Sequence, residues 1–148
     1  MFFEEILEND ALWIALLAWF IAQLIKLIIC FIRFKKINLR LMISSGGMPS
    51  SHSAFVTAIT TAIGINEGFD TPLFALGAII SLVVMYDASG IRRAAGKQAE
   101  ILNLFLDSVE NGFKLDKKLK EELGHTPVQV LIGALLGILV AITFNHFV

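Results

Sequence analysis

Four apolar stretches constrain the fold of this chain more than any other feature. They are separated by short polar segments and cover Ala11–Ile32, Ser53–Ile65, Thr71–Tyr86 and Val128–Phe144. A helix needs about 20 predominantly apolar residues to cross the hydrocarbon core of a bilayer; the first stretch reaches that length and the last approaches it. Charged residues make up only 17% of the chain, against about 25% in an average soluble domain. We therefore predict one all-α domain over residues 1–148, a polytopic membrane bundle with about four transmembrane helices.

The Lys and Arg residues are distributed unevenly between the segments that join these stretches. Arg33, Lys35, Lys36 and Arg40 follow the first stretch, and seven more basic residues lie between the third and the fourth. The first ten residues carry four acids and no base. Because cytoplasmic loops are enriched in Lys and Arg, we predict a multi-pass protein of the cell membrane with both termini outside.

The remaining segments refine this topology. Segment 91–123 is the most polar, and its apolar residues recur at helical spacing, so we predict an amphipathic helix on the cytoplasmic face. Thr71-Pro72 and Thr126-Pro127-Val128-Gln129 are typical helix starts, the second with a capping box. Cys30 is the only cysteine, which excludes an intramolecular disulfide. A soluble helical bundle with a buried apolar core is the alternative interpretation, since the second stretch is short.

The segment at the start of the second apolar stretch has the composition of a phosphate-binding turn. Its sequence is Gly46-Gly47-Met48-Pro49-Ser50-Ser51-His52-Ser53. Glycine lets backbone N–H groups approach an oxyanion, and the N-terminus of a following helix adds partial positive charge. An imidazole such as that of His52 titrates near neutral pH and suits proton transfer to a leaving oxygen. In the alternative, structural interpretation, Ser50 or Ser51 caps the helix and His52 packs at its start.

The predicted topology brings further ionisable residues to this end of the bundle. Lys26 and Arg33 are seven residues apart, which places them on one helix face about 10 Å apart in height. The others are Asp87, Arg92 and Arg93 at the end of the third stretch and His125 before the fourth. Cations that neutralise a phosphate, with one histidine as nucleophile and one as acid, form a phosphoryl-transfer site that needs no metal. The alternatives are that Lys26 snorkels to the headgroups, that the arginines only anchor the cytoplasmic side, and that His125 is a loop histidine.

Three segments, taken together, resemble a known family. They are residues 46–54 (GGMPSSHSA), 87–93 (DASGIRR) and 123–127 (LGHTP). They are similar to the divergent, YuiD-like branch of the proteins related to type 2 phosphatidic acid phosphatase and vanadium-dependent haloperoxidases. The resemblance implies a phosphatase in which His125 is the nucleophile that forms a phospho-histidine and His52 is the general acid. It implies phosphate ligands at Lys26, Arg33, Ser50, Ser51 and Arg92, with Asp87, Arg93 and Gln129 in supporting positions.

The resemblance also implies a lipid-phosphate substrate, with phosphatidylglycerophosphate favoured over prenyl diphosphate and phosphatidic acid. It implies no cofactor, and vanadate is expected to act as a phosphate mimic. Gln129 stands where the wider family has an aspartate that orients the nucleophile. This difference motivates a second hypothesis, a non-catalytic membrane protein that binds anionic lipid headgroups or phosphate. A haloperoxidase is a third interpretation, and nothing in the chain indicates nucleic-acid binding. Because four helices are fewer than the six of the wider family, a homodimer that completes the fold is a further hypothesis.

Overall fold

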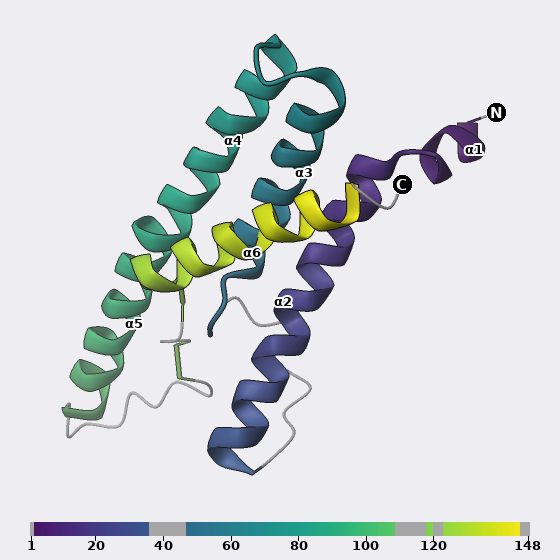
Figure 1. Cartoon of the computed structure of the whole chain (residues 1–148). Helices are drawn as coiled ribbons and strands as arrows, with labels where there is room; N and C mark the ends of the chain where they lie inside the picture. The colour runs from purple at the N-terminus through teal and green to yellow at the C-terminus, as the bar shows by residue number, and fades with distance from the viewer. Residues whose placement is uncertain (1, 36–46, 109–117, 120–122, 146–148) are drawn as a thin grey trace.

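The computed structural model describes residues 2–35, 47–108, 118–119 and 123–145, and these residues form helices and no strand (Figure 1). The helices are α1 (Phe2–Leu7), α2 (Asp10–Phe34), α3 (Ser51–Glu67), α4 (Pro72–Ser89), α5 (Ile91–Ser108) and α6 (Pro127–Asn145). The four apolar stretches correspond to α2, α3, α4 and α6, which confirms the predicted all-α class. The short helix α1 was not anticipated. Of the residues discussed above, Gly46, Lys36 and Arg40 lie outside the described residues.

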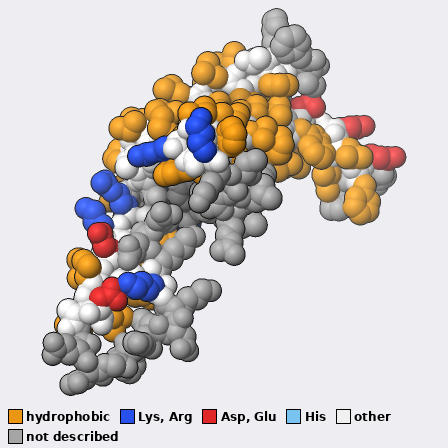
Figure 2. Space-filling model, turned by 90° about the horizontal axis from the view of Figure 1, so that it is seen from below, with side chains coloured by type: hydrophobic (Ala, Val, Ile, Leu, Met, Phe, Trp, Pro, Cys, Tyr) orange, Lys and Arg blue, Asp and Glu red, His pale blue; other side chains and the backbone are white. Residues whose placement is uncertain are grey.

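Three stretches of helix are long and apolar enough to cross a membrane. They are Asp10–Phe34, Pro72–Ser108, in which α5 follows directly on α4, and Pro127–Asn145. Figure 2 shows a broad hydrophobic area across the middle of this face of the molecule, as expected for helices that face lipid. Helix α3 is not among these stretches, so the predicted number of four spans is not confirmed. With 17 residues, it is about 25 Å long, which is less than the ~30 Å hydrocarbon core.

Helix α3 lies in the middle of the bundle and contacts α2, α4 and α6. Its buried face carries alanines at positions 54, 58 and 62, all completely buried. Ile14 and Ala18 of α2 and Val140 of α6 belong to the same core cluster as two of these alanines. Small side chains let helix backbones approach closely, and this packing stabilises helix association where lipid weakens the hydrophobic effect between helices. The shortest of these helices is therefore the one around which the others assemble.

Helix α6 crosses α3 obliquely instead of running parallel to it (Figure 1). Two glycines of α6 make this crossing possible. A Cβ atom at Gly133 would overlap the backbone of Ser50, and one at Gly137 would overlap the backbone of α3 and the hydroxyl of Thr57. The Thr57 hydroxyl also donates a hydrogen bond to the Ala134 carbonyl oxygen at 3.0 Å. The two glycines thus bring the backbone of α6 directly onto the first turns of α3.

The helix starts follow the predicted caps. The Thr71 hydroxyl accepts from the N–H of Phe74 at 3.3 Å, and Pro72 is the first helical residue of α4. At the start of α6, the Thr126 N–H donates to Gln129 Oε1 at 3.0 Å, and the Gln129 N–H donates to Thr126 Oγ1 at 3.3 Å. This reciprocal pair is the predicted capping box, and it satisfies N–H groups that have no partner inside the helix.

Helix α5 confirms the predicted amphipathic helix, and Ile101, Leu102 and Phe105 on it are exposed. On the part of the surface away from α1, Figure 2 shows Lys and Arg side chains, with some Asp side chains beside them. A group of Asp and Glu side chains lies around α1 instead. The end at α1 is therefore the acidic one, and the basic side chains lie away from it, as the charge distribution along the sequence predicts.

Candidate functional site

The serines of the glycine- and serine-rich segment build the start of α3. Ser50 is the N-cap, and its hydroxyl accepts hydrogen bonds from the N–H of Ser53 at 3.3 Å and from the hydroxyl of Ser53 at 2.9 Å. The N–H of Ser50 donates to the carbonyl oxygen of Gln129 at 3.1 Å, which ties this turn to α6. Ser50 and Ser51 are both buried. The capping role is thus confirmed for Ser50, while the hydroxyl of Ser51 takes a different partner.

That partner is Lys26, which points into the bundle. Its side chain is buried, with 3% of the residue exposed, and Nζ donates to Ser51 Oγ at 3.2 Å. Gly47, with φ of 92°, lies over the aliphatic stem, where a Cβ would come within 3.7 Å of Lys26 Cδ. The interpretation that Lys26 snorkels to the headgroups is therefore wrong. A buried ammonium group costs free energy unless it is paired, so this arrangement favours an anionic partner.

His125 is positioned through its backbone. Its N–H donates to the carbonyl oxygen of Ala88 at the end of α4, at 2.8 Å. The preceding Gly124, with φ of 81°, packs against the backbone of Arg92 and Arg93, where a Cβ would overlap. His125 is 2% exposed, and within the described part of the chain neither ring nitrogen has a partner at hydrogen-bond geometry, although the Gln129 side chain and the Gly47 backbone lie near the ring. Because buried polar groups are nearly always hydrogen-bonded, these two nitrogens indicate a site that a ligand completes.

The two predicted catalytic histidines lie close together. Their ring centroids are 6.4 Å apart, and the ring planes are tilted by 59°. His52, in the first turn of α3, is exposed, whereas His125 is buried. The structure therefore gathers His52, His125, Lys26 and Ser51 from α2, α3 and the segment before α6. These groups offer N–H and O–H donors and positive charge at a helix N-terminus, which is an environment suited to an oxyanion.

The surroundings of His125 determine its charge. Burial lowers the pKa of His125 below its ordinary value of 6.5, and the positive charge of Lys26 lowers it further. The Gln129 side chain and the Gly47 backbone oppose this shift without overcoming it. His125 is therefore neutral at pH 7, the form whose ring nitrogen carries a lone pair for attack on an electrophile.

Acidification is expected to destabilise the folded protein through His125. The unfolded chain takes up a proton on this imidazole near pH 6.5, while the lowered pKa keeps the folded form neutral, so the free energy of unfolding falls as the pH decreases through that value. The test measures the thermal stability of wild type and of His125→Gln in detergent at about pH 7.5 and about pH 5.5. The variant has no titrating group at position 125. The wild type should lose more stability than the variant on acidification. Equal losses would contradict the prediction.

Asp87 and Arg92 form an ion pair beside the histidines. Arg92 Nε donates to Asp87 Oδ2 at 2.6 Å, and both side chains are partly exposed. Both charges lie close enough to His52 to act on it electrostatically. Of the roles open to Asp87, orienting a histidine or pairing with an arginine, the structure shows the second. The terminal nitrogens of Arg92 make no hydrogen bond or ion pair to described residues, so they are available to an anion.

Three other predicted site residues have different surroundings. Arg33 is exposed in the last turn of α2, and its guanidinium lies 5.5 Å from the centroid of the Phe34 ring. Arg93 is also exposed, and in the described part of the chain neither arginine makes a hydrogen bond or ion pair to another site residue. Gln129 lies near His125, but its Oε1 accepts from Thr126 in the capping box. The capping interpretation of Gln129 is therefore confirmed.

One buried polar residue close to Lys26 in the sequence was not considered as a candidate. Gln23 precedes Lys26 by one turn on the same face of α2 and is only 3% exposed. A polar residue three positions before a lysine, within an otherwise apolar helix, is the signal that could have identified it.

No three His, Cys, Asp or Glu side chains gather closely enough to hold a metal ion within the described residues.

Comparisons with known proteins agree with this arrangement. A family model described as the divergent PAP2 family matches residues 7–140, which include every candidate site residue named above. The uncharacterized membrane protein YuiD of Bacillus subtilis (strain 168) is 42% identical over 155 aligned residues, covering 97% of this chain and 98% of the relative. No solved structure matches the chain. On these two matches, the chain is a multi-pass membrane protein that belongs to the divergent PAP2 family.

Proposed function

We propose that this protein is a membrane phosphatase that hydrolyses the phosphomonoester of a lipid without a metal ion. The observation that carries the proposal is the buried imidazole of His125, which has no hydrogen-bond partner among the described residues and lies close to the Lys26 ammonium. A neutral nucleophile next to a fixed positive charge is what attack on a phosphate dianion requires. Membership of the divergent PAP2 family supports the same class of reaction.

The proposed reaction has two steps. In the first, a ring nitrogen of His125 attacks phosphorus, the bond from phosphorus to the ester oxygen breaks, and protonated His52 gives its proton to the leaving alkoxide. In the second, His52 accepts a proton from a water molecule that attacks the phospho-histidine, which releases inorganic phosphate and restores both histidines. A reacting pair of atoms needs an approach of about 3–3.5 Å, so rings whose centroids are 6.4 Å apart can both reach one phosphoryl group.

The positive groups of the site have distinct proposed roles. Lys26, the hydroxyl of Ser51 and the N-terminus of α3 neutralise and hold the phosphate oxygens, and Arg92 closes the site from the α4–α5 junction. Ser50 keeps the helix start in place through its capping bonds. Arg33, which is exposed, can serve only by attracting the anionic headgroup toward the site.

The proposed substrate lies in the cytoplasmic leaflet of the cell membrane. Lys and Arg are concentrated in the sequence between α2 and α3 and between α4 and α6, whereas the first ten residues carry four acids and no base, and this bias supports a site that faces the cytoplasm with both termini outside. Phosphatidylglycerophosphate is the favoured substrate on family resemblance, ahead of prenyl diphosphate and phosphatidic acid. A homodimer remains a hypothesis to be tested on the purified protein.

Purified protein in detergent is expected to release phosphate from at least one lipid of a panel containing these three substrates. Addition of EDTA should leave the rate unchanged, because the proposed site uses no metal. Vanadate should inhibit, since it can adopt the five-coordinate geometry of phosphoryl transfer in the same positive environment. Phosphate release that depends on added divalent cation, or no release from any lipid in the panel, would refute the proposal.

One observation favours a second candidate function, binding of anionic headgroups without turnover. Within the described residues no carboxylate bonds to His125, and the nearby Asp87 is held by Arg92. Without such a partner an imidazole is oriented and stabilised less well during catalysis. Saturable binding of phosphatidic acid that survives the double replacement of His52 and His125, with no phosphate release by the wild type, would support this candidate.

A further inference from the structure

An apolar groove opens beside His52, on the side of α3 that faces α2 and α4. Its lining residues are Leu16 and Trp19 of α2, His52, Phe55 and Val56 of α3, and Val84 of α4, and its volume is about 400 Å³. We call it the His52 groove. The imidazole is the only ionisable group among these residues, and its ring centroid lies 6.4 Å from that of His125. The groove therefore ends at the candidate catalytic site.

The groove extends from the site along helices that cross the membrane. His52, Phe55 and Val56 share one face of α3, because residues three and four apart lie on the same side of a helix. On α2, Leu16 precedes Lys26 by ten residues, which corresponds to about 15 Å of helix rise. Leu16 and Trp19 are more than one-third exposed, so the groove is open along its side. An apolar chain can enter it laterally from the bilayer while its headgroup stays at the buried lysine.

We propose that the His52 groove binds the hydrocarbon chain of the substrate whose phosphate occupies the site at His125. This inference rests on the proposed function and adds that the chain is recognised, so that the enzyme selects lipid phosphates over soluble ones. The charge pattern supports this occupant: an apolar channel meets a positively charged pocket, which matches an amphiphile with an anionic head. The volume also lies within the range of about 300–1,000 Å³ that small-molecule sites occupy.

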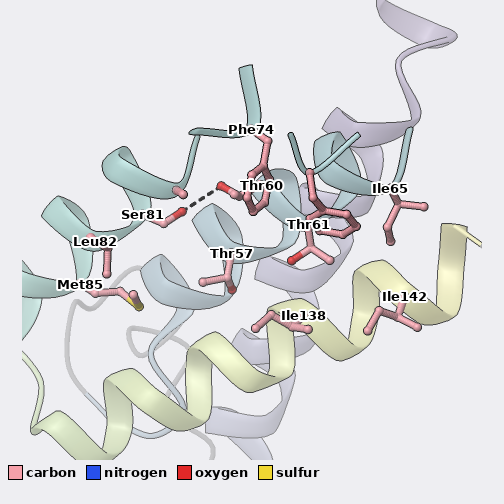
Figure 3. A pocket seen from close by; sticks show the side chains of 12 residues that line it. Thr57, Thr60, Thr61, Ile65, Phe74, Ser81, Leu82, Met85, Ile138 and Ile142 are labelled. Carbon is pink, nitrogen blue, oxygen red and sulfur yellow. Dashed lines mark hydrogen bonds between the residues drawn. The ribbon is translucent and has the colours of Figure 1, made fainter. Parts of the chain in front are cut away.

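A second apolar groove provides a matched control. It lies between α3, α4 and α6, has a volume of about 480 Å³, and contains no titratable side chain among its lining residues (Figure 3). Two of its hydroxyl groups have partners within the protein: the Thr60 and Ser81 hydroxyls are 2.9 Å apart, and Ser81 donates to the Val56 carbonyl oxygen at 3.0 Å. We call it the threonine groove. It resembles the His52 groove in size and apolarity but does not include a candidate catalytic residue.

The test fills each groove from the same helix. Val84→Phe narrows the His52 groove, and Ala78→Phe narrows the threonine groove by a substitution on the same helix, α4. The Val84 variant should raise KM for dioleoyl phosphatidic acid about tenfold, because mismatched volume in an apolar pocket has effects of this order. The Val84 variant should leave kcat/KM for a soluble aryl phosphate unchanged. Ala78→Phe should change neither the KM for the lipid nor the kcat/KM for the aryl phosphate. Equal effects on both substrates, or equal effects of both variants, would overturn the proposal while the phosphatase function stands.

A second measurement does not depend on turnover. Phosphatidic acid with a diazirine on its acyl chain is photo-crosslinked to the protein in detergent, beside phosphatidylcholine with the same chain. Phosphatidic acid should label the peptides of α2 and α4 that line the His52 groove more strongly than phosphatidylcholine does. Lys26→Met should remove this difference. Equal labelling by both lipids would overturn the chain-binding proposal. Stronger labelling by phosphatidic acid in a protein that releases no phosphate would refute the phosphatase function but support binding of the lipid chain in the groove.

Discussion

Replacement of His125 by alanine is expected to lower kcat/KM for phosphate release from lipids by at least about a thousandfold. The imidazole supplies the atom that bonds to phosphorus, and no second nucleophile can take its place in the proposed reaction. The effect should be catalytic and not structural. His125 is held by its backbone bond to Ala88, which alanine keeps, and the ring makes no hydrogen bond to described residues. Initial rates in detergent micelles, together with a thermal unfolding curve for each variant, provide the measurement.

His52→Ala is the matched comparison, because it removes the other imidazole of the pair. Loss of a general acid lowers the reaction rate about 10²–10⁴-fold when the leaving group is a lipid alkoxide, because this group needs a proton to leave. An aryl phosphate leaves readily without that proton, so His52→Ala should keep most of kcat/KM for this substrate, a ratio that reports the first step and not the hydrolysis of the phospho-histidine, in which His52 also acts. His125→Ala should remain inactive with both. If His125→Ala retains wild-type activity on lipids, or if His52→Ala is equally impaired with both leaving groups, the assignment of the two roles is wrong.

Replacement of Lys26 by methionine is expected to reduce kcat/KM by about 10²–10³-fold, as for other single groups that stabilise developing charge. The same substitution should maintain or raise thermal stability, because methionine fills a similar volume and removes the cost of a buried ammonium. Opposite changes in activity and stability would separate a functional lysine from a structural one. The measurements are the initial rate, the apparent midpoint of thermal unfolding, and the concentration of vanadate that halves the rate.

Lys97→Met serves as the control for Lys26→Met, since Lys97 is exposed on α5 and its replacement removes the same charge from a residue outside the candidate site. It should leave kcat/KM within about twofold, because exposed charges are screened by salt and solvent. Lys26→Met with unchanged activity and unchanged vanadate sensitivity would show that no phosphate binds at the start of α3. A parallel loss in both lysine variants would indicate a general effect of surface charge instead.

The helices and their caps could be predicted because they depend on local sequence. Thr71-Pro72 and the Thr126–Gln129 box begin helices where expected, since the capping bonds join residues only three positions apart. The meeting of Lys26 with Ser51 follows from one further assumption, that adjacent apolar helices run in opposite directions. Such contacts can be predicted from the order of the helices and from the helix end at which each polar residue lies.

Other features depend on how the helices pack and were not predicted. The oblique crossing of α6 requires Gly133 and Gly137 to meet the α3 backbone, and nothing local to those glycines specifies the partner helix. Arg33 shares a helix face with Lys26 in the sequence, yet it is exposed and lies next to Phe34, because the last residues of α2 extend beyond the packed part of the bundle and are all exposed. The predicted fourth span is not confirmed, since α3 is short and central.

The sequence by itself determined the all-α class, the apolar helices, their caps and the end of the bundle at which the ionisable residues lie. These properties follow from composition and from bonds between near neighbours in the chain. Only the tertiary structure decided that Lys26 is buried, that the His125 ring has no hydrogen-bond partner among the described residues, and that an apolar groove leads to His52. The physical reason is that burial and the pairing of polar atoms depend on side chains from several helices at once, and this information is absent from any single segment.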